Sequence, residues 1–155
     1  MNDGGHRNDQ LHAASRSGDL PTARQLIADG HDPNAFDEIG KTPLHYAVEI
    51  GDIRMAAFLI GVGADVNARD ESLVSDTPLA ANAQRCTLEM AHLLVESGAD
   101  PTIRGWMQFN ALDRARERKR AEGIEVCRFL ETAAEKFKTQ QHLAPYGSQA
   151  RRRRR

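Results

Sequence analysis

Histidine and cysteine are the side chains of this sequence that could do chemistry, and their spacing argues against catalysis. The six histidines are scattered, and the chain has no HExxH motif, no GxSxG turn and no Walker glycine loop. Cys86 and Cys127 form neither a disulfide framework nor a CxxC metal pair. We expect two buried thiols in two different helices, no cofactor, no metal site and no enzymatic activity.

The elements that position these side chains follow an internal period. Leu11, Leu44, Leu79 and Leu112 begin matching segments spaced 33, 35 and 33 residues apart, and a glycine follows each of the first three leucines by 19 residues. A fixed period of this size indicates stacked supersecondary units rather than one globular core.

The second unit shows most clearly why each segment should be a pair of helices. Thr42 is suited to cap a helix, and Pro43 to occupy its first turn, where its missing N–H is not needed. Leu44, Ala47 and Val48 then lie on one apolar stripe. The sequence therefore predicts a first helix that ends near Gly51, followed by a second helix that ends near Gly63.

Thr42-Pro43-Leu44-His45, Gly51-Asp52 and Gly63-Ala64-Asp65-Val66-Asn67 together resemble the ankyrin repeat. The resemblance covers roughly residues 8–137. It implies an all-α solenoid of helix-turn-helix units joined by β-hairpin-like fingers, in which His45 and His12 tie neighbouring loops together. The expected repeats are 8–34, 35–67, 68–102 and 103–137, between a disordered N-terminus, 1–7, and a disordered basic tail, 138–155.

The third and fourth repeats depart from this pattern. Ala80 replaces the histidine of the third repeat, which puts the family's hydrogen-bond pattern there in doubt, and the preceding finger gains two residues. In the fourth repeat we expect a longer first helix after Asn110. Its second helix should have an apolar face made of Ile124, Val126, Cys127, Phe129 and Leu130.

Composition favours one soluble domain without a membrane span. We expect it in the cytoplasm or, in a eukaryote, also in the nucleus. The chain has 155 residues, of which 40% are hydrophobic and 28% charged, and no apolar run is long enough to cross a bilayer. Residues 1–103 carry 16 acidic and 7 basic side chains, or −9, whereas residues 104–155 carry 6 and 14, or +8. Such polarity can orient an encounter with a partner.

The resemblance implies that a monomer binds another protein through its finger tips and the exposed side of its first helices. The residues at these variable positions are Phe36, Glu38, Ile39, Lys41, Tyr46, Glu49, Ile50, Arg69, Glu71, Ser72, Leu73, Val74, Gln84, Arg85, Arg104, Trp106, Met107, Phe109, Arg114, Glu117 and Arg118. The expected role is that of an adaptor, an inhibitor or an immunity-type protein.

Trp106, Met107 and Phe109 stand where polar turn residues are usual, and with Leu73 and Val74 they would form an apolar patch beside arginines. Such a patch is typical of a protein interface. The alternative is that Trp106 and Phe109 fold inward and cover the divergent fourth repeat.

Two further interpretations concern the tail and one asparagine. The arginines Arg151, Arg152, Arg153, Arg154 and Arg155 could contact nucleic acid or an anionic membrane, could resemble a nuclear localisation signal, or could be an uninvolved solvated tail. Asn67 stands in a segment that resembles the ankyrin sequence hydroxylated in animal cells, although asparagine is first of all a turn residue.

Overall fold

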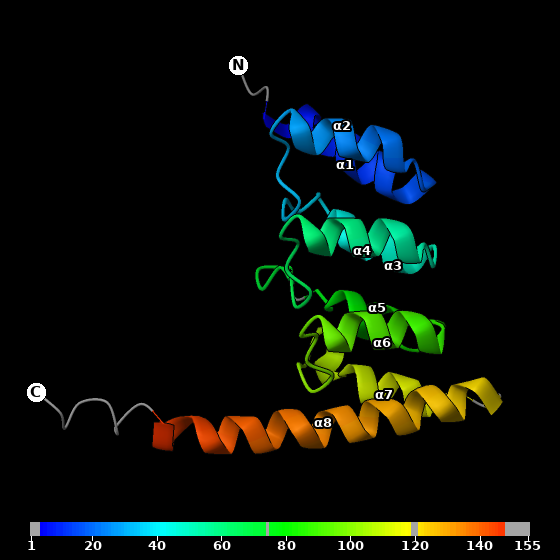
Figure 1. Ribbon diagram of the computed structural model, residues 1–155, viewed down its shortest axis with the longest axis vertical. Helices are drawn as coiled ribbons and strands as arrows, with labels where there is room; N and C mark the ends of the chain where they lie inside the picture. The colour runs from blue at the N-terminus through cyan, green and yellow to red at the C-terminus, as the bar shows by residue number, and fades with distance from the viewer. Residues whose placement is uncertain (1–3, 74, 119–120, 148–155) are drawn as a thin grey trace, which may run out of the picture.

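The computed structural model describes residues 4–73, 75–118 and 121–147. These residues form four helix pairs stacked in one direction, and they contain no β-strand (Figure 1). The pairs are α1 (Gly4–Ser17) with α2 (Leu20–Ala28), α3 (Pro43–Glu49) with α4 (Ile53–Gly61), α5 (Pro78–Asn82) with α6 (Leu88–Glu96), and α7 (Ala111–Arg116) with α8 (Ala121–Gly147).

Polar caps and glycines fix where these helices begin and end. The Asp52 carboxylate accepts hydrogen bonds from the Arg54 and Met55 amides at the start of α4, both at 3.0 Å. The Thr77 hydroxyl accepts a hydrogen bond from the Ala80 amide at the start of α5. Gly51 lies between α3 and α4 with φ +74°, a left-handed conformation that side chains disfavour.

The core is a column of leucine, methionine and alanine that runs through the stack. Leu44 and Leu79 are fully buried, as are Met55 and Met90 of the second helices, and small residues such as Ala47 let neighbouring helices approach closely. α1, α3, α5 and α7 contact one another in sequence, and α4, α6 and α8 form a second row. Each repeat therefore packs mainly on its neighbours.

Side-chain amides also join successive repeats. The Asn34 amide donates to the Gly63 carbonyl at 3.0 Å and accepts from the Asp65 backbone at 2.7 Å. Asn67 makes the same pair of bonds to the following repeat, at 2.9 and 2.8 Å. Asn67 is thus a bridge between repeats, and its hydroxylation stays a prediction.

The loops before α3, α5 and α7 all project on the same side of the stack, at the left ends of the helices in Figure 1. We call them the first finger (36–41), the second finger (69–76) and the third finger (104–109). A backbone hydrogen bond joins the two arms of each finger: Asp37 donates to Lys41 at 2.9 Å, Ser75 to Asp70 at 3.0 Å, and Gly105 to Phe109 at 2.9 Å.

The two ends of the stack differ from the sequence-based expectation. α1 begins at Gly4, within the segment expected to be disordered, and α8 continues to Gly147, beyond the expected boundary at 137. Residues 138–144 contain no proline or glycine, the two residues that most disfavour a helix, so the chain can continue as a helix there. Within the described residues, no helix is long and apolar enough to cross a membrane.

Three expectations for the third and fourth repeats were wrong. α7 is short, six residues, and Arg118, two residues past its end, donates to the Ala83 and Cys86 carbonyls of the preceding repeat. Cys86 lies in the turn between α5 and α6 rather than in a helix, whereas Cys127 lies in α8. Ile124 is 53% exposed, so the buried apolar face of α8 starts at Val126 and continues through Leu130 to Ala134.

Candidate functional site

The first finger is a tight turn that holds its apolar tip in solvent. The Asp37 carboxylate accepts hydrogen bonds from the amides of Ile39 at 3.0 Å and Lys41 at 2.9 Å. Although burial raises the pKa of Asp37, hydrogen bonds from Tyr46, Lys41 and Ile39 outweigh it and hold that pKa below its ordinary value. The turn leaves Ile39 63% exposed.

The second finger uses the same device with different residues. The Asp70 carboxylate accepts from the Ser72 amide and hydroxyl at 2.9 and 2.6 Å, and the Ser75 hydroxyl accepts from the Asp70 amide at 2.7 Å. These bonds turn the chain so that Leu73 is 49% exposed. An aliphatic side chain thus occupies the tip of each of these two fingers.

The third finger displays the largest apolar side chains. Trp106 is 56% exposed, Met107 61% and Phe109 41%, so these residues do not fold inward to cover the fourth repeat. Met107 and Gln108 both have positive φ, 56° and 63°, which non-glycine residues rarely adopt and which local contacts must maintain.

Asp76, which the sequence analysis did not select, holds the third finger in place. Its carboxylate accepts from the Trp106 amide at 2.8 Å and from Arg114 Nη2 at 2.7 Å. A Cβ on Gly105 would come within 2.8 Å of the Asp76 Cα, so only glycine permits this approach. Two further bonds, Arg104 Nη1 to the Gln108 carbonyl and Arg69 Nη1 to the Arg104 carbonyl, complete the support.

The sequence contained a weak signal for Asp76. It directly precedes Thr77-Pro78, in the repeat where Ala80 replaces the bridging histidine. The Asp76 carboxylate makes the link from this repeat to the next that the histidine side chain would otherwise supply. The expectation of an altered hydrogen-bond pattern at this repeat was therefore correct, and the replacement is a carboxylate.

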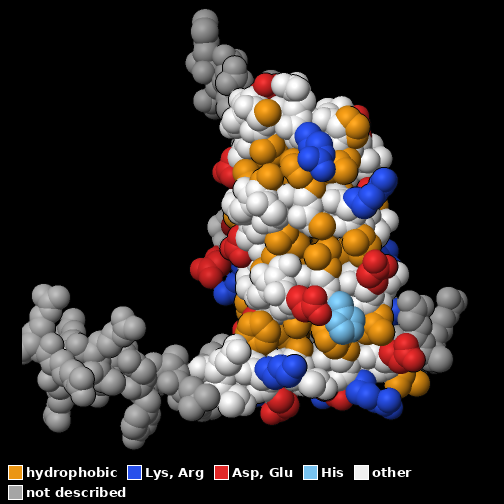
Figure 2. Space-filling view, viewed as in Figure 1, with side chains coloured by type: hydrophobic (Ala, Val, Ile, Leu, Met, Phe, Trp, Pro, Cys, Tyr) orange, Lys and Arg blue, Asp and Glu red, His pale blue; other side chains and the backbone are white. Residues whose placement is uncertain are grey.

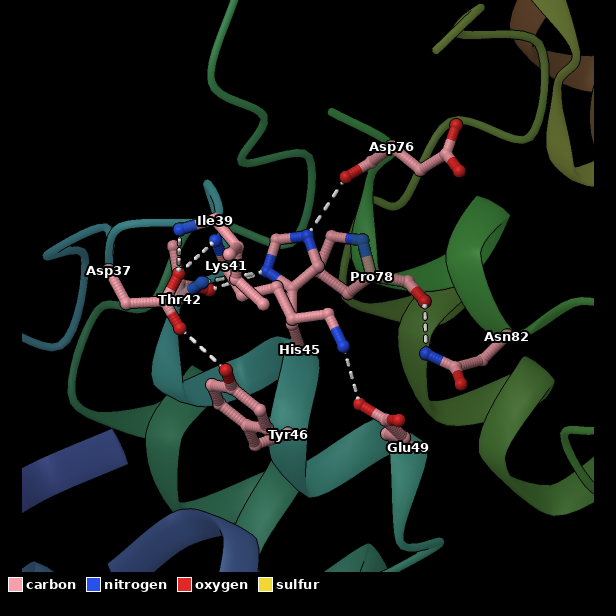
Figure 3. Close-up of polar contacts among 10 residues, drawn as sticks. All are labelled: Asp37, Ile39, Lys41, Thr42, His45, Tyr46, Glu49, Asp76, Pro78 and Asn82. Atoms are coloured by element: carbon pink, nitrogen blue, oxygen red, sulfur yellow. Dashed lines mark hydrogen bonds and ion pairs between the residues drawn. The ribbon is translucent and has the colours of Figure 1, made fainter. Parts of the chain in front are cut away.

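The histidine bridge itself is present in the second repeat, as Figure 3 shows. The Thr42 amide donates to His45 Nδ1 at 3.0 Å, and His45 Nε2 lies 2.9 Å from the Asp76 carbonyl. Because an amide only donates and a carbonyl only accepts, His45 is neutral with its proton on Nε2. Burial lowers the pKa of His45 from 6.5 to about 4, which keeps the bridge neutral at physiological pH.

His12 makes the corresponding bridge one repeat earlier. Its Nε2 lies 3.0 Å from the Ala35 carbonyl and 3.1 Å from the Lys41 carbonyl, at the two ends of the first finger. The structural role expected of both histidines is therefore present in the structure.

The structure brings the three fingers together around a shallow cavity of about 220 Å³. Ile39, Leu73 and Trp106 contribute its apolar walls, and His45 and Asp76 contribute polar atoms at its base. A second hollow of about 240 Å³ lies at the other end of α3 and α5, where Glu49, Ile50 and Arg85 meet Cys86. Seven of the sequence-selected residues thus line two hollows that share α3 and α5.

Tyr46 was wrongly expected at the partner-binding surface. It is only 4% exposed, because its ring lies under Arg16 and Lys41 and its hydroxyl donates to the Asp37 carboxylate at 2.5 Å. Burial and this hydrogen bond raise the pKa of Tyr46. Tyr46 therefore supports the first finger from beneath.

The remaining selected residues are mostly accessible. Lys41, Arg114 and Arg118 are half-buried. Val74 and the five terminal arginines lie outside the described residues. The exposed selected residues are Phe36, Glu38, Ile39, Glu49, Ile50, Arg69, Glu71, Ser72, Leu73, Gln84, Arg85, Arg104, Trp106, Met107, Phe109 and Glu117. The second-helix face in Figure 2 shows apolar side chains in bands between repeats, interrupted by charged residues. No group of His, Cys, Asp and Glu within the described residues could hold a metal ion.

Comparison with known families agrees with this geometry. A family model described as ankyrin repeats matches residues 11–105 in three copies, and a search of the curated proteins finds no match. The chain therefore belongs to the ankyrin repeat family. Ankyrin repeats are generally protein–protein interaction modules and are typically non-catalytic. The match ends before α7, as the divergence of the fourth helix pair would suggest.

Proposed function

We propose that this protein is a non-catalytic binding module that engages another protein through its three fingers and the exposed side of its first helices. The exposure of Trp106 is the observation that carries the proposal. A tryptophan that is 56% exposed gains little from packing, yet the backbone that carries it is held by Asp76 and Arg104. Rigid display of a large aromatic side chain reduces the entropy lost on binding.

The arrangement of apolar tips supports the same proposal. Ile39, Leu73 and Trp106 come from three different fingers and meet around one cavity. Interfaces commonly place aromatic and aliphatic anchors at such a centre and surround them with polar residues. An adaptor, an inhibitor and an immunity-type protein would each use a surface of this kind.

The proposal is tested by affinity capture from a lysate of the source organism, comparing the wild type with Trp106→Ala. An anchoring tryptophan contributes at least about 2 kcal/mol, or roughly a 30-fold change in affinity, so the variant should lose the partner. Ile124→Ala is the matched control, because Ile124 is similarly exposed, at 53%, but lies in the first turns of α8, and Figure 1 shows that α8 begins at the end away from the fingers. Ile124→Ala should capture the partner as well as the wild type does.

A chain that ends at Gln141 separates the alternative function from the first. If the truncation alone loses the captured material, and that material is nucleic acid or anionic lipid, the basic tail is the functional element. If the truncated chain retains the captured partner and Trp106→Ala loses it, the result supports the finger surface as the binding site.

A further inference from the structure

The size of the finger cavity suits one side chain rather than a whole small molecule. The cavity measures about 220 Å³, whereas sites for drug-sized molecules measure about 300–1,000 Å³. Ile39, Leu73 and Trp106 form its apolar walls, and Trp106 remains 56% exposed there. An arginine side chain fits these walls chemically, because its aliphatic stem packs on apolar surface and its guanidinium is attracted to the face of an indole ring.

The loops on the finger side carry a negative excess. Residues 29–42, 62–77 and 97–110 connect each second helix to the next first helix. They contain nine acidic and three basic side chains, or −6. Arg114 of α7 pairs with Asp76 at 2.7 Å and offsets one of these charges, which leaves −5.

The three basic side chains of these loops are already engaged. Lys41 lines the cavity, but it pairs with Glu49 of α3 at 2.7 Å. Arg69 pairs with Glu71 at 2.9 Å. Arg104 donates a hydrogen bond to a backbone carbonyl within its own finger. These cations are therefore not available to the other carboxylates of the loops.

Several loop carboxylates have no cation beside them. Within the described part of the chain, no ion pair reaches Glu38 of the first finger, Asp70 of the second finger or Asp65. Arg85 and Arg118 lie with the second hollow, at the other end of α3 and α5. The negative excess is thus local to the finger side, where a basic segment would complement it.

The chain carries such a segment on the same side of the stack. α8 runs toward the finger side and continues to Gly147, 13 residues or about 20 Å beyond Ala134, the last of its described side chains to be buried (Figure 1). Residues 148–155 lie outside the described residues, include five arginines and span about 26 Å when extended. That span exceeds the 20 Å overhang, so the arginines can return to the fingers.

We propose that the arginines at 151–155 occupy the finger side of their own chain, with one arginine side chain in the cavity between Ile39, Leu73 and Trp106. The neighbouring arginines pair with loop carboxylates such as Glu38. Because the segment is attached by a short linker, its effective concentration at the cavity is millimolar. The tail then competes with the partner for this surface. The inference rests on the proposed function for this consequence and adds regulation of the binding site to it.

Quenching of Trp106 fluorescence by acrylamide measures whether the tail covers the cavity. Trp106 is the only tryptophan, so the signal comes from this site alone. The wild type is compared with a full-length variant in which all five arginines at 151–155 are replaced by glutamine. In 0.01 M salt the Stern–Volmer constant of the wild type should be lower by about 2-fold. In 1 M salt the two constants should agree, because the Debye length falls from about 30 Å to about 3 Å.

Variants of the loop carboxylates test where the tail lies. Glu38→Gln combined with Glu71→Gln removes two exposed charges of the fingers and should raise the low-salt quenching of Trp106 toward that of the tail variant. Glu89→Gln combined with Glu125→Gln is the matched control. Both control residues are exposed and lie in the first turns of α6 and α8, at the ends away from the fingers (Figure 1). The control should be quenched as little as the wild type.

Capture from the lysate gives the second readout. Without competition from its arginines, the tail variant should retain several-fold more partner than the wild type in low salt. Equal capture by the two proteins would overturn the competition.

The other failures can be told apart. Equal quenching of the wild type and the tail variant in low salt would overturn this inference and leave the proposed function standing, since that function is tested by capture. Quenching of the wild type that depends on protein concentration would make the tail of a second copy the occupant and would also overturn it. Undiminished capture by Trp106→Ala would instead remove the proposed function, and with it the regulation.

Discussion

The buried neutral state of His45 predicts that this protein loses stability as the pH falls from 6.5 to 4. His45 is 2% exposed, and its two ring nitrogens are engaged by the Thr42 amide and the Asp76 carbonyl. The folded chain resists protonation until about pH 4, whereas the unfolded chain takes up a proton below pH 6.5. A pKa difference of this size corresponds to about 3 kcal/mol of unfolding free energy.

The sign of the effect follows from proton uptake. Because the unfolded state binds more protons between pH 6.5 and 4, acid favours unfolding over this range. The contribution of His45 to stability is complete above pH 6.5 and is lost progressively down to pH 4.

The assay is urea denaturation at several pH values for the wild type and for His45→Gln. The variant has no titrating group at this position. Between pH 6.5 and 4 its unfolding free energy should therefore fall by about 3 kcal/mol less than that of the wild type. Carboxylates titrate in both proteins and cancel in the difference. Equal slopes for the wild type and His45→Gln would refute the reasoning.

Five substitutions probe the packing. Leu44→Ala should cost about 2–5 kcal/mol of unfolding free energy through cavity formation, whereas exposed Glu38→Ala should change it by less than about 0.5 kcal/mol. Gly105→Ala should destabilise by about 1–3 kcal/mol because its Cβ meets Asp76, whereas Gly61→Ala, which has open space in α4, should stabilise by about 0.4–1 kcal/mol. Asp76→Ala should cost about 3 kcal/mol, since it leaves Arg114 without its partner. Urea denaturation checks all of them, and similar values for Leu44→Ala and Glu38→Ala would contradict the assigned faces.

The repeats could be predicted from sequence because local chemistry and periodic burial agree. Thr42 and Pro43 indicate where α3 begins, and the in-phase leucines Leu44 and Leu79 are fully buried as expected. The bridging role of His45 followed from the family resemblance. The sequence indicated the position of the fingers but did not decide between an exposed and an inward-folded Trp106.

The details that the sequence did not predict depend on contacts between distant residues. The partners of Asp76, Trp106 and Arg114, lie 30 and 38 residues away from it in the sequence. Tyr46 occupies a position expected to face a partner, but Arg16 and the first finger cover it. Apart from the position of Asp76 directly before Thr77-Pro78, no local pattern indicates either arrangement.

Hydrogen–deuterium exchange of the chain alone and with its captured partner tests the proposed binding surface most directly. The account predicts slower exchange on binding in the three fingers, 36–41, 69–76 and 104–109, and unchanged exchange in α4 and α6. Protection confined to α4 and α6, with unchanged fingers, would contradict the account.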